Sequence, residues 1–167
     1  MSIMDEAFVG EVAEAFARDI VRDIAPQEMP LFNSLARSGL EGCMKTRTSD
    51  SGRAEMLSFG MDVVVPIMTP IVLSAVMAVV KYVLGIIRES MKDAVGDVIK
   101  NALKALFKRL QSKDGQAGGE RPINLTKDQL VEIRKLVLDI ARGKDGLAES
   151  DATVLADAIV GRLAIAP

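Results

Sequence analysis

The chain has 167 residues, enough for one domain or for one domain with a small appendage. It has no histidine, no tryptophan and one cysteine, which excludes histidine-containing catalytic pairs, histidine-ligated metals and CxxC sites. Its net charge of −2 leaves the whole chain without the basic footprint of a nucleic-acid-binding protein, and nucleic acid is not an expected partner.

The N-terminal segment predicts an amphipathic helix from about Met4 to Ala25, ended by Pro26. A shorter helix is expected from Pro30 to Arg37, with Gly39 as its stop. No basic stretch precedes an apolar core here, so a secretory signal is not expected. The apolar face of the first helix comprises Phe8, Val9, Val12, Ala13, Phe16, Ala17, Ile20, Val21 and Ile24.

Residues 42–60 have a loop-like composition with no apolar period. They include Cys43, the single cysteine, which cannot form an intrachain disulfide and therefore indicates a reducing compartment. We expect the chain at a membrane, either its cytoplasmic face or an inner membrane; the alternative is the cytoplasm.

An uncharged apolar run extends from Val63 to Val80, 18 residues, and resumes after Lys81. This length is at the threshold for a transmembrane helix. A span beginning at Pro70 would place Lys81 near the bilayer centre, at a cost of about 2.5–3.5 kcal/mol that the neighbouring aliphatic residues roughly offset. The alternative is a central helix of a bundle, apolar all round because other helices surround it.

The helix that contains this run has a start signal at Thr69 and Pro70, with threonine as N-cap and proline in the first turn. No strong stop follows before Gln111, so one helix of about 62 Å is possible. A break near Gly85 or near Gly96 is equally compatible with the sequence.

A polar stripe on this helix consists of Ser74, Lys81 and Arg88, which are spaced by seven residues. One interpretation is an oligomer whose helices approach closely through small residues and turn the stripe toward a shared axis. The other is the solvent edge of a bundle helix. The small residues that complete this membrane or oligomer face are Ala75, Ala78 and Gly85.

The continuation of the chain predicts a basic amphipathic helix. Its apolar face comprises Val95, Val98, Ile99, Leu103, Leu106, Phe107 and Leu110, and its basic stripe comprises Lys100, Lys104, Lys108 and Arg109. Such a helix lies on anionic membrane surfaces or in partner grooves, or it has a solvated outer face over a core-facing side.

The C-terminal part predicts a helical hairpin after a flexible linker at residues 111–121. Thr126 and Gln129 form a capping box before a helix over Lys127–Ala141. A turn over residues 143–146 follows, and Ser150 or Asp151 is expected to cap the last helix. The inward residues expected on that last helix are Val154, Leu155, Ala158, Ile159 and Leu163.

These patterns predict an all-α helical bundle with a long apolar central helix and a C-terminal hairpin. The divisions are residues 1–61, 62–110, 111–121 and 122–167. No catalytic residue, cofactor or metal site is predicted. The expected function is that of a non-enzymatic, self-associating membrane protein, either a membrane-permeabilising effector or an anchor whose hairpin binds a protein partner. The alternative is a soluble structural or adaptor protein with its apolar helix buried in a bundle or homo-oligomer.

Overall fold

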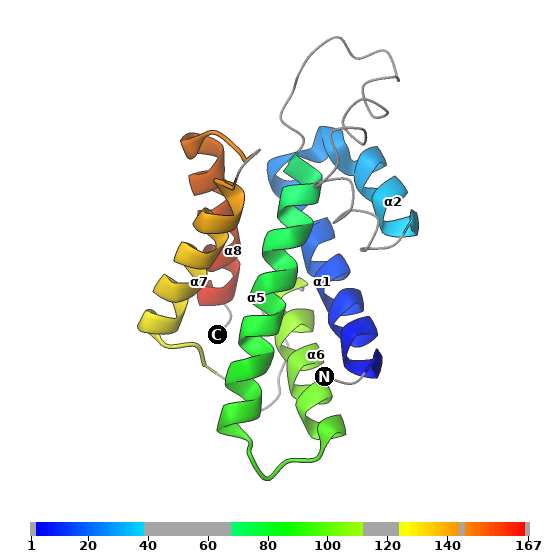
Figure 1. Cartoon of the computed structure of the whole chain (residues 1–167), viewed down its shortest axis with the longest axis vertical. Helices are drawn as coiled ribbons and strands as arrows, with labels where there is room; N and C mark the ends of the chain where they lie inside the picture. The colour runs from blue at the N-terminus through cyan, green and yellow to red at the C-terminus, as the bar shows by residue number, and fades with distance from the viewer. Residues whose placement is uncertain (1–2, 39–67, 112–123, 144–145, 166–167) are drawn as a thin grey trace.

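The computed structural model describes residues 3–38, 68–111, 124–143 and 146–165 (Figure 1). Helices make up 88% of these residues and no strand occurs among them, which confirms the all-α class. In chain order the elements are α1 (Ile3–Ile24), the 3-10 turn η1 (Pro26–Glu28), α2 (Met29–Ser38), α5 (Met68–Ser90), α6 (Gly96–Gln111), α7 (Lys127–Ala141) and α8 (Glu149–Ile165).

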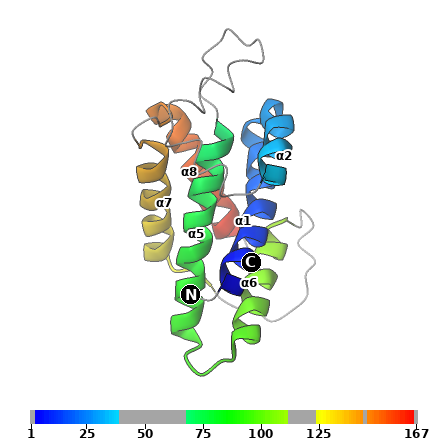
Figure 2. The same cartoon turned by 45° about the vertical axis from the view of Figure 1, so that its right-hand side comes forward.

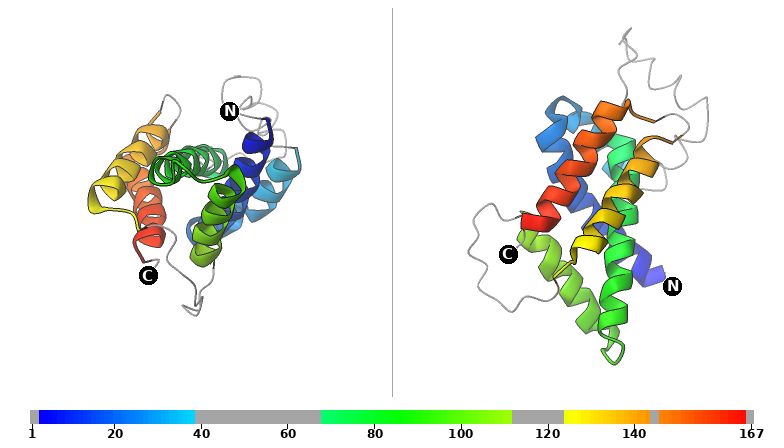
Figure 3. Two further views of the ribbon diagram at one scale, coloured as in Figure 1. Left: turned by 90° about the horizontal axis from the view of Figure 1, so that it is seen from below. Right: turned by 90° about the vertical axis from the view of Figure 1, so that its left-hand side faces the viewer.

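The apolar helix α5 lies in the middle of the bundle, as predicted. It contacts α1 and α6 on one side and α7 on the other, while α8 contacts both α7 and α1. Seen along the bundle, α5 lies between α7 on one side and α1 on the other (Figure 3, left). Helix α5 runs antiparallel to α1, α6 and α7, and a short turn joins it to α6 at one end (Figures 1 and 2).

Helix α1 confirms the predicted amphipathic pattern. The row formed by Val9, Ala13, Phe16, Ala17 and Ile20 is fully buried, with charged side chains on the opposite side. Phe8 and Ile24, at the ends of the predicted face, are only half-buried. The spacing of three and four residues places this row on one side of the helix, which packs against α5.

The long middle segment breaks before Gly96, not at Gly85. Helix α5 ends at Ser90, where the Met91 N–H donates to the Ile87 carbonyl oxygen at 3.0 Å, and α6 begins at Gly96. Gly85 stays inside α5 on its exposed side, where its weak helix propensity costs only about 1 kcal/mol. The chain must reverse after α5 because the apolar face of α6 packs on α1 and α5.

The ends of α5 and α6 also differ from expectation. Thr69 is not the N-cap of α5, since the described helix begins one residue earlier at Met68. Val95 and Val98 do not belong to the buried face of α6, because their exposed fractions are 71% and 46%. They lie at the turn end of α6, whereas the buried face is formed farther along by Ala102, Leu103, Leu106 and Phe107.

The C-terminal hairpin is present and its capping box is confirmed. The Thr126 hydroxyl accepts from the Gln129 N–H at 3.2 Å, and the Gln129 side chain accepts from the Thr126 N–H at 2.9 Å. After α7, the Leu147 N–H donates to the Ala141 carbonyl oxygen at 2.7 Å, which turns the chain toward α8. Helix α7 then packs against α5, so the hairpin forms part of the bundle.

Two details of α8 were predicted incorrectly. The helix begins at Glu149, so Ser150 and Asp151 lie in its first turn and do not precede it as caps. Val154 is 52% exposed, and the fully buried residues of α8 include Ala152 and Ala156. Ala152, Ala156, Ile159 and Leu163 are spaced by three or four residues and share one face of the helix with Leu155, whereas Val154 lies on the opposite side.

Several expected features lie outside the described residues. They are the Gly39 stop, the loop over residues 42–60 with Cys43, the first residues of the apolar run (63–67), and most of the linker (112–121).

Candidate functional site

The face predicted for membrane or oligomer contact lies along the outer edge of α5. Lys81, Gly85 and Arg88 are exposed, and Ser74 and Ala78 are half-buried. A Cβ at Gly85 would meet nothing within 4 Å, so this part of the helix opens to the surroundings. Ala75, by contrast, is fully buried and points into the bundle, because consecutive residues differ by 100° around a helix.

Helix α5 has the length and composition of a membrane-spanning helix and is the one such helix in the described ranges. Its mean hydropathy reaches 2.2 over an 18-residue stretch, of which 56% is buried inside the bundle. A central helix of a water-soluble bundle passes the same test, because burial also favours an apolar composition. Composition alone therefore leaves both interpretations open.

The start of α5 is held by a carboxylate from another part of the chain. Glu28, at the end of η1, accepts hydrogen bonds from the Met68 N–H at 3.0 Å and the Thr69 N–H at 2.7 Å. The Thr69 hydroxyl also donates to Glu28, at 2.7 Å. Thr69 is fully buried, and its hydroxyl is satisfied by this contact. A negative group at a helix N-terminus is additionally favoured by the helix dipole.

A second polar contact joins α5 to α7. The Tyr82 hydroxyl donates to the Glu132 carboxylate. This hydrogen bond, together with burial and the negative charge of Glu132, raises the pKa of Tyr82 from 10.0 to about 12. The neutral phenol is therefore the form that donates this hydrogen bond between α5 and α7.

The basic stripe of α6 lies beside the N-terminal half of α1. Lys104 and Lys108 are exposed and Lys100 is half-buried, while the side chain of Arg109 lies outside the described part. The Lys104 ammonium lies 5.3 Å from the centre of the Phe8 ring, a cation–π distance. The stripe thus lies on the surface, and one of its lysines also contacts α1.

Beneath this stripe, α6 is anchored to α1 by an aromatic pair. The rings of Phe16 and Phe107 are 5.2 Å apart between centroids, at an interplanar angle of 69°. Edge-to-face geometry of this kind is the favoured arrangement of two phenyl rings. Farther along α1, Asp23 pairs with Arg162 of α8.

The described residues form no group of three or more metal-ligand side chains, and each buried side-chain polar atom among them has a hydrogen-bond partner. The polar contacts at Glu28, Tyr82 and Arg162 each join one helical element to another. Sequence reasoning missed the Glu28 contact. The sequence has an acidic residue shortly after Pro26 and a threonine directly before Pro70, but no sequence pattern predicts that these two side chains meet.

Comparison of the chain with protein-family models, curated proteins and solved structures finds no match.

Proposed function

We propose that the chain is a non-enzymatic structural or adaptor protein that acts through contacts with other proteins, with α5 as the internal core helix of its working state. The observation that supports this proposal is the position of α5. Eleven of its 23 residues are buried, and α1, α6 and α7 cover it. An apolar helix covered in this way needs no bilayer to remove it from water.

The charges on α1 support the same proposal. Glu11 is exposed near the middle of α1, the helix that runs beside α5, and the partly exposed ion pair of Glu14 and Arg18 follows it. If α5 crossed a bilayer in this arrangement, α1 would enter with it, and each charge near the bilayer centre costs about 2.5–3.5 kcal/mol. Membrane insertion would therefore require α5 to leave α1 and α7.

A second candidate function is membrane association by an opened or self-associated form. The hydropathy of α5 and the exposed lysines Lys104 and Lys108 favour it. In this form α5 would insert, and the outer edge with Ser74, Lys81 and Arg88 would line an oligomer axis.

Gly85 offers a substitution that separates the two candidates. Gly85→Glu adds a charge where the bundle is open, so the folded protein should tolerate it, whereas an α5 inserted with this edge toward lipid should not. Gly85→Ala is the matched control without charge. The assay is flotation with anionic vesicles, together with sedimentation of the detergent-free protein.

For the core-helix proposal, we expect both variants and the parent to be soluble without detergent and to remain in the bottom fraction. If the parent and Gly85→Ala float with the vesicles and Gly85→Glu does not, the core-helix proposal is wrong and α5 inserts into the membrane. Flotation of all three proteins that high salt reverses would instead indicate surface binding through the basic stripe of α6. Flotation of all three that resists high salt would indicate insertion with the Gly85 edge at a polar oligomer axis.

A further inference from the structure

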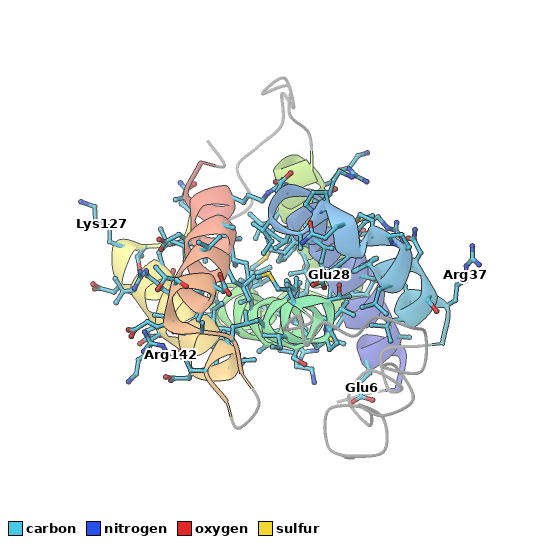
Figure 4. All side chains as sticks on the ribbon, turned by 90° about the horizontal axis from the view of Figure 1, so that it is seen from above. Glu6, Glu28, Arg37, Lys127 and Arg142 are labelled. Atoms are coloured by element: carbon cyan, nitrogen blue, oxygen red, sulfur yellow. The ribbon has the colours of Figure 1, made fainter. Side chains whose placement is uncertain are left out.

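The connection between η1 and α5 joins two segments that are far apart in the sequence. The three hydrogen bonds to the Glu28 carboxylate come from residues 40 and 41 positions later. Figure 4 shows Glu28 pointing between the α1–α2 corner and the N-terminal end of α5. The other labelled side chains, Glu6, Arg37, Lys127 and Arg142, project outward. The corner that carries Glu28 is itself fixed, because the Glu28 N–H donates to the Ala25 carbonyl oxygen at 2.9 Å.

The first turn of α5 depends on this carboxylate for its backbone donors. The first N–H groups of any α-helix have no acceptor inside the helix. In α5, Glu28 takes two of them, from Met68 and Thr69, and Pro70 has no N–H to satisfy. Helices usually obtain these acceptors from an adjacent N-cap side chain, so α5 has a cap supplied by a remote segment.

Apolar packing contributes less to this turn than to the rest of α5. Met68 and Pro70 are half-buried, and the continuous series of buried aliphatic side chains begins at Ile71. Farther along, α5 is fastened by that packing and by the Tyr82–Glu132 contact. The polar contact at Glu28 is therefore the principal attachment of the first turn.

We propose that Glu28 is a clasp that controls local opening of the α5 N-terminus, as a step separate from unfolding of the whole bundle. When the clasp is broken, the first turn of α5 separates from the α1–α2 corner while the remainder of α5 stays packed. This inference goes beyond the proposed function, and holds whether α5 is a permanent core helix or a helix that can be released.

The test is amide hydrogen exchange by NMR on the full chain. The variants are Glu28→Ala and Glu28→Gln, with Gln27→Ala as the matched control in the same turn, where the side chain is exposed. Loss of hydrogen bonds to a charged acceptor should accelerate exchange at Met68, Thr69 and Ile71 roughly tenfold to a hundredfold in Glu28→Ala. Glu28→Gln keeps one acceptor oxygen and should show a smaller acceleration.

Amides in the middle of α5, such as Val79, and in α7, such as Ile133, should exchange at nearly the parent rate. Two results would overturn the proposal: unchanged exchange in the first turn, or equal acceleration at Val79 and Ile133, which would make Glu28 only a contributor to global stability. If Glu28→Ala does not fold, Thr69→Val provides the test, because it removes one of the three hydrogen bonds and keeps both N–H donors. It should still accelerate exchange selectively in the first turn, and failure to do so would equally contradict the clasp.

Discussion

The aromatic pair between α1 and α6 gives a quantitative test of how the bundle is closed. Phe16 and Phe107 are 0% and 2% exposed, and their rings meet edge to face at 5.2 Å. Truncating a buried phenylalanine to alanine costs about 3–5 kcal/mol. Two such losses approach the whole stability of a domain, which is about 5–15 kcal/mol. Leucine is the better substitute, because it keeps most of the apolar bulk and removes the ring contact.

The measurement is a double-mutant cycle from urea unfolding of the parent, Phe16→Leu, Phe107→Leu and the double variant. We expect the two substitutions to couple by about 0.5–1.5 kcal/mol, the range for an edge-to-face pair beyond its buried area. As a control, Phe107→Leu is combined with Ile133→Val, since α6 and α7 lie on opposite sides of α5 (Figure 3). That pair should be additive within about 0.3–0.5 kcal/mol. Equal coupling in both cycles would refute the argument that α6 folds back onto α1 through this contact.

Four further substitutions test a position inside a helix, a turn, a helix cap and a titrating side chain. Gly85→Ala should raise the free energy of unfolding by about 0.5–1 kcal/mol, because the site is open and helical. Gly146→Ala should lower it, because a Cβ there would lie 2.2 Å from a backbone carbonyl oxygen of α7; urea midpoints that move in the same direction in both variants would contradict this. Thr126→Ala should cost about 1 kcal/mol by removing half of the capping box, and an unchanged melting temperature would show that the box contributes nothing. In an ultraviolet titration, Glu132→Gln should lower the pKa of Tyr82 from about 12 toward its ordinary value of 10.0. Folding raises the pKa of Tyr82, so the stabilisation from the Tyr82–Glu132 contact is complete below pH 10 and is lost as the pH rises toward 12. A parent protein that is equally stable at pH 10 and at pH 12 would contradict this prediction.

Sequence patterns correctly predicted the features that depend on interactions between residues close together in the chain. The alternation of apolar and charged residues in α1 and the capping box at Thr126 each involve residues within one or two helical turns, and both are confirmed. The break at Gly96 could not be separated from one at Gly85, because the choice depends on whether α6 can reach α1. The outward position of Val154 was missed for a similar reason, since the side of α8 that is buried depends on where α7 and α1 pack.

The candidate site illustrates the same limit more strongly. The sequence identified α5 as unusually apolar, but the hydropathy of a helix depends only on its composition. It does not show whether other helices or lipid cover that helix. The bond from Glu28 to the start of α5 spans 40 residues and leaves no periodic trace. Thr69 was correctly singled out as a residue of the helix start, yet its hydroxyl bonds to a carboxylate that only the tertiary structure brings near.

The pairing of α1 with α5 has a consequence for synthesis of the chain. The last residue of α1 is Ile24 and the last residue of α5 is Ser90, so the ribosome adds 66 residues between completing the two helices. At about 5–20 residues per second this takes roughly 3–13 seconds. During that interval the apolar face of α1, with Phe16 and Ile20, is without its main partner. The nascent chain is therefore a candidate client for chaperones that bind amphipathic helices, and codons that slow translation before α5 should lower the soluble yield.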